Sequence, residues 1–372
     1  MAHFIQAVTV PWYNACADYA VTLARGLRAL GHRVTVAGGS GSPAVARARD
    51  LGFEALERPG SASWNPLELV RLVKTYRSYV RDHGVAAVNV HHGRDHLFWA
   101  AAMRGTGIPL VRTSGNQIPP KIHPGTRRLL RHHTAGIIAS CGAVRKYYAD
   151  GFGINPERIP VINGGVDASF FTPHNPREAL RSALGIPGEA FVFGIIGRYS
   201  PVKGHRYFFE AAEEVSLVSP DAWFVVAGWN AQLNGEDMRA MAERAGIIER
   251  TRFTGRQNDI RDLIGSIDAG VIASIGSETV CRIAMEYMAM GIPVIAAGTN
   301  VIPEIIRDGE TGWIVPPGDS GAMAVAMGRL LASREGAHAL GLNGRDRVER
   351  EFSLERFAEK TLDAYRSMSI HV

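Results

Sequence analysis

Short apolar runs alternate with amphipathic stretches along the chain. An apolar run at 4–10 is followed by residues that share one helical face: Ala20, Leu23, Ala24, Leu27 and Leu30. Asp18 is the predicted N-cap of this helix, and Gly31 is suited to end it in a left-handed conformation. A second apolar run follows at 34–37. This strand–helix–strand order predicts a parallel sheet covered by helices.

The same alternation continues in two series, each long enough for one domain. Strands of the first series are predicted at 85–90, 110–112, 135–139 and 159–162. Those of the second are predicted at 191–196, 223–227, 271–274, 293–296 and 313–315. We therefore expect an α/β protein with a first domain at 1–170 and a second at 171–353. The final segment, 354–372, contains a helical pattern that can dock back onto the first domain.

The composition is that of an ordinary globular protein, with 46% hydrophobic and 21% charged residues. We expect no signal peptide, because the start of the chain lacks a basic segment followed by a long apolar stretch. No apolar run approaches the ~20 residues that span a bilayer. The three cysteines are scattered and lack metal-ligand spacing, which indicates a reducing cytoplasm and no zinc site.

Charge is divided unevenly along the chain. Residues 1–170 carry 20 Lys and Arg against 10 Asp and Glu, whereas the rest carries 21 against 26. A basic first half indicates an anionic partner, either nucleic acid, acidic lipid head groups or a phosphorylated acceptor. The alternative is a merely solubilising surface.

Within this basic half, the segment 121–133 interleaves cations with apolar residues. It could lie peripherally on the inner face of the cytoplasmic membrane or grip a phosphorylated, lipid-linked acceptor. A solvated basic helix is the alternative. Nucleic-acid binding is disfavoured, because no recognised nucleic-acid module accompanies the charge.

The strongest local signal is the segment 197–204, which follows a predicted buried strand. Open α/β sheets bind ligands at the carboxyl ends of their strands. Gly197 is followed there by Arg198, and Lys203 by a second glycine. Two cations on a flexible backbone suit a diphosphate, with Arg as a bidentate donor and Lys as a point charge. Two surface cations flanking a turn are the alternative.

The second signal is a predicted helix start near Thr279, between Glu278 and Glu286. Free backbone N–H groups at a helix start form a natural phosphate site. Eight positions of helix separate the two carboxylates by ~12 Å, farther apart than the catalytic pair of a glycosidase. They could instead grip opposite ends of one ligand, with Glu278 on sugar hydroxyls and Glu286 on a ribose diol. The alternative is that Glu278 only complements the helix dipole and that Glu286 is a solvated surface charge.

These segments resemble the signatures of the retaining family 4 glycosyltransferases. The two glutamates with 288–295 resemble that family's E-x7-E motif, and 197–204 resembles its phosphate-binding G-R…K-G element. Further similarity lies at 162–167, 303–306 and 309–315. The resemblance covers essentially the whole chain and is densest at 191–320. It implies the GT-B fold, two Rossmann-like domains facing each other across a deep cleft.

The resemblance also implies a role for each motif residue. Arg198 and Lys203 would contact the donor diphosphate with Gly197, and the backbone near Thr279, Val280 and Cys281 would bind phosphate. Glu278 would orient the donor sugar and Glu286 would hold the ribose. Arg256 would lie near the base. The implied reaction moves a sugar from a nucleotide-diphosphate sugar, with UDP favoured over GDP or ADP, to a glycan or lipid-linked acceptor. Cell-envelope polysaccharide or lipopolysaccharide synthesis is the expected setting.

His91 occupies the place of the family's strand-end histidine, which faces the donor sugar. An ordinary polar loop is one alternative. A metal site is another, although adjacent histidines on a strand point apart. The chain departs from the family at Asn89, where a second histidine is usual. It departs again at 11–18, where bulky residues replace a glycine-rich loop, which puts any carry-over of acceptor contacts there in doubt.

No Asp-x-Asp occurs in the sequence, so we expect a metal-independent enzyme without a cofactor. A non-catalytic sugar-nucleotide-binding protein or a sugar-nucleotide epimerase of the same fold are the alternatives. The intact set of two cations and two glutamates argues against the first, and the second would need carboxylates that we cannot place. A dinucleotide dehydrogenase is disfavoured, since no G-x-G-x-x-G follows the first strand.

Overall fold

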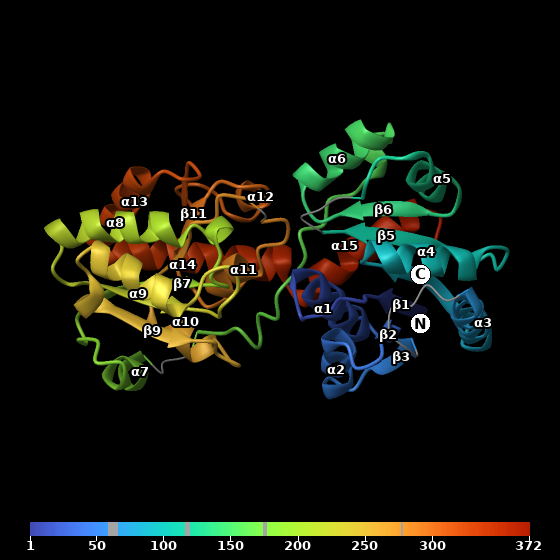
Figure 1. The fold of residues 1–372 in the computed structure, drawn as a ribbon, viewed down its shortest axis with the longest axis horizontal. Helices are drawn as coiled ribbons and strands as arrows, with labels where there is room; N and C mark the ends of the chain where they lie inside the picture. The colour runs from blue at the N-terminus through green and yellow to red at the C-terminus, as the bar shows by residue number, and fades with distance from the viewer. Residues whose placement is uncertain (59–65, 116–119, 174–176, 277) are drawn as a thin grey trace. The chain divides into compact units, whose positions relative to one another are not determined.

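The computed structural model describes residues 1–58, 66–115, 120–173, 177–276 and 278–372. They form two compact units, shown in Figure 1. Unit 1 comprises Met1–Gly165 with Phe352–Val372, and unit 2 comprises Val166–Glu351. The sequence places these boundaries after residues 170 and 353. Among the helices described, none has the length and apolar character needed to cross a membrane.

Unit 1 is built on a parallel sheet in the order β3-β2-β1-β4-β5-β6. Its strands are β1 (His3–Ala7), β2 (Arg33–Gly39), β3 (Glu54–Arg58), β4 (Val85–Val90), β5 (Leu110–Ser114) and β6 (Gly136–Ala139). Its helices are α1 (Ala15–Ala29), α2 (Pro43–Asp50), α3 (Pro66–Asp82), α4 (Gly93–Met103), α5 (Pro124–His132), α6 (Gly142–Phe152), the short η1 (Pro156–Arg158) and α15 (Leu354–Ser367).

Unit 2 repeats this arrangement in the order β12-β11-β10-β7-β8-β9. Its strands are β7 (Phe191–Ile196), β8 (Ala222–Ala227), β9 (Thr251–Gly255), β10 (Ala269–Ile272), β11 (Val294–Ala297) and β12 (Gly312–Val315). Its helices are α7 (Arg177–Ala183), η2 (Pro201–Lys203), α8 (His205–Val218), α9 (Gly235–Arg244), η3 (Ile248–Arg250), α10 (Arg261–Ser266), α11 (Arg282–Ala289), α12 (Ile302–Ile305), α13 (Ser320–Ala332), α14 (Arg334–Arg347) and η4 (Val348–Phe352), which leads back to unit 1.

Helices lie on both sides of each sheet (Figure 1), which confirms the predicted α/β class with two Rossmann-like units. The strand order reverses between β1 and β4 in unit 1 and between β7 and β10 in unit 2. Ligands of open α/β sheets bind outside the carboxyl ends of the strands at such reversals. The loops that leave these four strands are therefore where a site is expected.

The start of α1 differs from the prediction. Asn14 is the N-cap, and its side chain accepts hydrogen bonds from the backbone N–H groups of Cys16 and Ala17 at 3.0 and 3.1 Å. The prediction that Asp18 caps this helix is wrong, because Asp18 lies one turn inside it. Its carboxylate still lies near the positive end of the helix dipole.

The last helix, α15, packs along α1 inside unit 1. A Cβ on Gly26 would lie 2.3 Å from the carbonyl oxygen of Leu354, so the two helices touch backbone to backbone. Phe357 and Tyr365 of α15 have no exposed surface. The C-terminal segment therefore belongs to the core of unit 1.

Candidate active site

The loop after β7 is pressed against the loop that leaves β10. Gly204 has a φ of +69°, and a Cβ added there would lie 1.9 Å from the carbonyl oxygen of Ala273. The backbone N–H of Ile275 donates to the carbonyl of Val202 at 3.0 Å. Only glycine combines this positive φ with so close an approach. The glycine that follows Lys203 therefore holds η2 against the end of β10.

The same loop is tied on its other side to the end of β8. The backbone N–H of Gly197 donates to Ala227 at 2.9 Å, and that of Tyr199 donates to Trp229 at 2.9 Å. A Cβ on Gly228 would lie 1.8 Å from the carbonyl oxygen of Gly197. The segment between Gly197 and Lys203 is thus fixed between its neighbours, which presents its side chains from a rigid backbone.

Lys203 and Glu278 form an ion pair across the strand reversal. The Glu278 carboxylate also accepts a hydrogen bond from Ser274 Oγ at 2.6 Å, and its residue is 4% exposed. The Glu278 carbonyl accepts from the backbone N–H of Val301 at 3.0 Å. A buried carboxylate is stable only with such partners. These contacts fix Glu278 beside the ammonium group of Lys203.

Arg198 lies on the same loop as Lys203 and is half-buried. Within the part of the chain that the structure describes, no side-chain hydrogen bond or ion pair engages its guanidinium. An arginine in this state can accept an anionic ligand without first breaking a protein contact.

The start of α11 lies beside Lys203. The helix begins at Arg282, and Cys281 is its N-cap with φ 36° and ψ 60°, a left-handed conformation that is rare outside glycine. No side chain caps this end. Glu278, which pairs with Lys203, lies three residues before Cys281 in the chain, so the ion pair lies near the helix start. Backbone N–H groups at an uncapped helix start attract anions.

Cys281 and Val280 are themselves buried, at 4% and 5% exposure, so they offer backbone rather than side chain to a ligand. Thr279 is half-buried. Burial raises the pKa of the Cys281 thiol well above its usual value. The thiol therefore stays protonated near neutral pH, which excludes a thiolate nucleophile here.

Glu286 lies within α11 and is 3% exposed. Its Oε1 forms an ion pair with Arg282 Nε at 2.9 Å, and the Arg282 side chain is partly exposed to solvent. The expectation of eight helical positions between Glu278 and Glu286 is wrong, because the chain is helical only from Arg282 onward. The estimate of ~12 Å along one helix therefore does not apply.

Arg256 follows β9 and is exposed, with its guanidinium 5.7 Å from the centre of the Trp229 ring. Trp229 follows β8, and 45% of its surface is exposed. These two side chains lie together at the same edge of the sheet as Lys203. An arginine beside an aromatic ring can stack against an aromatic base.

His91 lies in unit 1 at the end of β4 and is 1% exposed. Its Nε2 is 2.8 Å from Gln6 Oε1, and Gln6 also accepts from the Asn89 side chain at 3.1 Å. Burial lowers the pKa of His91 to about 3. The structure thus encloses His91 as a neutral, hydrogen-bonded group, and its contact with substrate stays a prediction.

Two partners in the site were not expected from sequence. Ser274 was predicted only as the end of a strand, yet it holds Glu278. Arg282 lies between the two glutamates and was given no role from the sequence, yet it pairs with Glu286. Their positions, four residues before each glutamate, are the only sequence signal for either contact. Among the described residues, no group of three or more His, Cys, Asp and Glu is placed to hold a metal ion.

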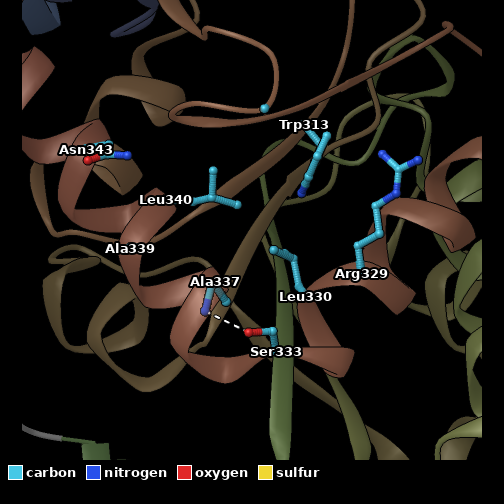
Figure 2. Close-up of a pocket in the computed structure, with 10 residues that line it drawn as sticks. Trp313, Arg329, Leu330, Ser333, Ala337, Ala339, Leu340 and Asn343 are labelled. Atoms are coloured by element: carbon cyan, nitrogen blue, oxygen red, sulfur yellow. Dashed lines mark hydrogen bonds between the residues drawn. The ribbon is translucent and has the colours of Figure 1, made fainter.

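A separate pocket of about 390 Å³ lies between β12, α13 and α14 (Figure 2). Its walls include Trp313, Leu330 and Leu340, and the Arg329 guanidinium covers the Trp313 ring at 4.6 Å from its centre. None of the predicted site residues lines this pocket. The predicted residues of unit 2 instead lie on the loops after β7, β9 and β10 and on α11, whereas His91 lies in unit 1.

Comparison with known families matches both units of the chain. Residues 176–347 match the model described as glycosyl transferases group 1, and residues 17–170 match the model described as glycosyltransferase family 4. A D-inositol 3-phosphate glycosyltransferase of Mycobacterium marinum is 32% identical over 219 residues. That alignment covers 57% of this chain and 46% of the relative, so the chain spans about half the length of the curated relatives it matches.

Solved structures match the whole chain. A glycosyltransferase from Rickettsia africae superimposes with a TM-score of 0.88 at 20% identity, covering 100% of this chain and 99% of that one. Anabaena Alr3699/HepE, solved in complex with UDP, gives a TM-score of 0.84 at 19% identity, covering 99% and 100%. These likenesses confirm the predicted fold class.

Proposed function

The chain belongs to the family 4 glycosyltransferases with the GT-B fold, and we propose that it moves a sugar from a nucleotide-diphosphate sugar to a glycan or lipid-linked acceptor. The observation that carries this proposal is the meeting of Lys203, Glu278 and the start of α11 at the strand reversal of unit 2. A cation, an uncapped helix start and a carboxylate at one point suit a phosphorylated sugar. The phosphate would bind the cation and the helix start, and the sugar hydroxyls would donate to the carboxylate.

Each group has a role in this proposal. The diphosphate is bound by Lys203, Arg198 and the backbone N–H groups near Val280 and Cys281. It also comes close to the backbone at Gly197. Glu278 accepts hydrogen bonds from the donor sugar, and Glu286 accepts from the ribose. Arg256 lies near the base.

We propose a retaining reaction. The bond between the anomeric carbon and the β-phosphate oxygen breaks, and its electron pair leaves with the phosphate. The acceptor hydroxyl attacks the same face and its oxygen bonds to the anomeric carbon, while its proton passes to the departing phosphate. Lys203, Arg198 and the α11 start stabilise the charge that develops on the leaving group. These fixed charges take the place of a metal ion.

UDP is the first nucleotide to test, since Alr3699/HepE was solved with it. For the acceptor we propose a saccharide of cell-envelope polysaccharide or lipopolysaccharide synthesis. The exposed cations Lys121, Arg127, Arg128 and Arg131 on and before α5 support a peripheral association with the anionic inner face of the cytoplasmic membrane.

A thermal-shift panel of UDP, GDP and ADP, each with and without a hexose, tests the donor. A ligand that binds only the folded protein raises its melting temperature. We expect one nucleotide to raise it, and Lys203→Ala to remove most of the shift. Lys146→Ala is the matched control, because Lys146 is an exposed lysine of α6 that forms a surface ion pair with Asp150. A full set of nucleotides without effect on the wild-type protein would count against the proposal.

A further inference from the structure

Two hollows adjoin each other on unit 2 at the start of β12. The first is the pocket of about 390 Å³ between β12, α13 and α14 (Figure 2). The second has a volume of about 250 Å³, and Asn343 lines both. Its other lining residues are charged or polar: Arg307, Glu310, Thr311, Asp346, Arg347 and Arg350. Ligand pockets commonly measure about 300 to 1,000 Å³, so the two hollows together can hold one small molecule.

This place lies away from the proposed donor site. Gly309 and Trp313 line the first hollow, just before β12 and within its first residues. The residues assigned to the donor diphosphate instead follow the carboxyl ends of β7 and β10. Since the strands of this sheet are parallel, their amino and carboxyl ends lie on opposite edges. A molecule bound here would therefore be additional to the donor.

The first hollow has apolar walls and a hydrogen-bond donor. Leu330, Ala337 and Leu340 are among its lining residues. The indole N–H of Trp313 is buried, and among the residues that the structure describes it meets no hydrogen-bond acceptor. Figure 2 shows this nitrogen on the side of the ring toward Leu330 and Leu340. Leaving a buried N–H without an acceptor is costly, so the hollow suits a ligand that brings one.

The second hollow is bordered by arginines whose ion pairs are long. Arg307 and Arg347 share the Glu351 carboxylate at 3.3 and 3.4 Å, and Arg307 lies 3.7 Å from the Glu310 carboxylate. Tight pairs between a guanidinium and a carboxylate measure about 2.7 to 2.9 Å. Arg347 is 7% exposed, so its charge is largely removed from water. A further anion can therefore approach Arg307 and Arg347 without breaking a tight ion pair.

The turn between the two hollows is fixed. Gly309 lines the first hollow, and Glu310 and Thr311 line the second. The backbone N–H of Thr311 donates to the Arg307 carbonyl at 3.0 Å, and the Asn343 side chain donates to the Glu310 carbonyl at 3.1 Å. The apolar and the cationic hollow are thus held side by side on one rigid turn.

The two linings together define the chemistry of an occupant. They carry four guanidinium groups, counting Arg329, against two carboxylates. A phosphate monoester carries a charge of about −1.5 to −2 near neutral pH, and its oxygens can accept from several guanidinium groups at once. We propose that the two hollows form one binding site for a small organic phosphate with an apolar body. The phosphate binds among the three arginines of the second hollow, and the body fills the first hollow beside Trp313.

Indole N–H signals in a ¹⁵N NMR spectrum test this site directly, and the signal that disappears in Trp313→Phe identifies Trp313. The wild-type protein is titrated with 1-naphthyl phosphate, which has an aromatic body, and with octyl phosphate, which has a lipid-like chain. We expect at least one of them to move the Trp313 signal saturably, with or without saturating UDP. The tighter of the two tells which kind of body the site takes. Inorganic phosphate and 1-naphthol, each only half of the first probe, should bind at least tenfold more weakly.

Two pairs of exposed positions supply variants with matched controls. Arg350→Ala should weaken binding at least fivefold, whereas Arg366→Ala should leave it unchanged. Both are exposed arginines in local ion pairs, at 2.8 and 2.7 Å. Ala339→Phe places a ring in the first hollow from an exposed position on α14 and should abolish binding. His338→Phe, at the neighbouring exposed position of the same helix, should not.

Three results would overturn the site. They are a Trp313 signal unmoved by both esters, esters that bind no more tightly than inorganic phosphate and 1-naphthol, and equal effects of each variant and its control. A Trp313 shift that saturating UDP abolishes would also overturn it, because the esters would then occupy the donor site. The proposed function is tested separately, since UDP binding at Lys203 does not require this site.

Discussion

At the scale of single residues, both glutamates of the motif already hold a cation before any ligand arrives. Glu278 pairs with Lys203, and Glu286 pairs with Arg282. A diphosphate that binds Lys203 therefore competes with the Glu278 carboxylate for the same ammonium group. Once the phosphate has taken Lys203, the Glu278 carboxylate regains capacity to accept from sugar hydroxyls.

This competition predicts opposite effects of one substitution. Glu278→Gln removes the charge that competes for Lys203, so we expect UDP alone to bind more tightly, by about tenfold or about 1.4 kcal/mol. Transfer from the UDP-sugar should fall, because the amide orients sugar hydroxyls less well than a carboxylate. Titration calorimetry with UDP and a transfer assay measure the two effects. Weaker UDP binding in the variant would show that the pair is needed intact.

Buried histidines predict a loss of stability in mild acid. Burial lowers the pKa of His91 and His96 to about 3 and that of His205 to about 4, against 6.5 for an ordinary histidine. Between these values the unfolded chain binds protons that the folded chain does not. Stability is thus complete above about pH 6.5 and falls as the pH falls, by up to about 1.4 kcal/mol per pH unit for each histidine.

Urea unfolding at pH 7, 6 and 5 measures this slope. The slope should become shallower in His96→Asn, which removes one titrating ring that contacts Thr134 Oγ1 at 2.9 Å. An unchanged slope would mean that His96 does not contribute to the acid sensitivity.

The sequence points to residue types but not to their partners. Lys203 and Glu278 stand out because each sits in a recognisable segment, yet their contact joins positions far apart in the chain, across two strands. Ser274 and Arg282 could not be assigned, because serine and arginine are common at strand ends and helix starts. The sequence predicts Asp18 as the N-cap of α1, but Asn14 is an equally good capping residue, and only the backbone conformation decides between them.

At the scale of elements, the central strands were predictable, as were the edge strands β6 and β12, but the edge strands β3 and β9 were not. β4 and β7 lie where the apolar runs predict them, because strands covered on both faces are continuously apolar. β3 and β9 were missed, since their sequences EALER and TRFTG are half-exposed and mix charge with apolar residues. The apolar run at 159–162 is not a strand, and only Val161 makes a single bridge to Ala139.

Gly204 makes one of the two closest backbone contacts in the site. Gly204→Ala must place a Cβ against the carbonyl of Ala273, whereas Gly246→Ala, at nearly the same positive φ of 66°, meets nothing within 4 Å. The control should lose about 1 to 2 kcal/mol of unfolding free energy from backbone strain alone. Gly204→Ala should lose at least about 2 kcal/mol more from the clash, together with UDP binding. Equal losses at the two positions would contradict the close approach.

At the scale of the whole molecule, charge separates the two halves of the chain. The first 170 residues carry a net +10 and the remainder a net −5. The exposed cations of α5 contribute to this excess. We propose that they direct the protein to anionic membranes, where a lipid-linked acceptor would lie.

Vesicle co-sedimentation tests whether the cations of α5 bind the protein to anionic membranes. Phosphatidylglycerol vesicles should bind the protein and phosphatidylcholine vesicles should not, with binding falling as salt rises. Arg128→Glu with Arg131→Glu should weaken binding by about 1 kcal/mol or more for each cation lost. Arg71→Glu with Lys74→Glu on α3 changes the net charge equally and should have a smaller effect. Equal losses would show that net charge, rather than α5, governs binding.

The proposed function requires one anion to be held jointly by the loop after β7 and the start of α11. A crystal structure of the protein with UDP tests this most directly. We expect the diphosphate within hydrogen-bonding distance of Lys203 Nζ, the Arg198 guanidinium and the backbone N–H groups near Cys281, with the ribose on Glu286. A diphosphate bound elsewhere, with Lys203 still paired to Glu278, would contradict it.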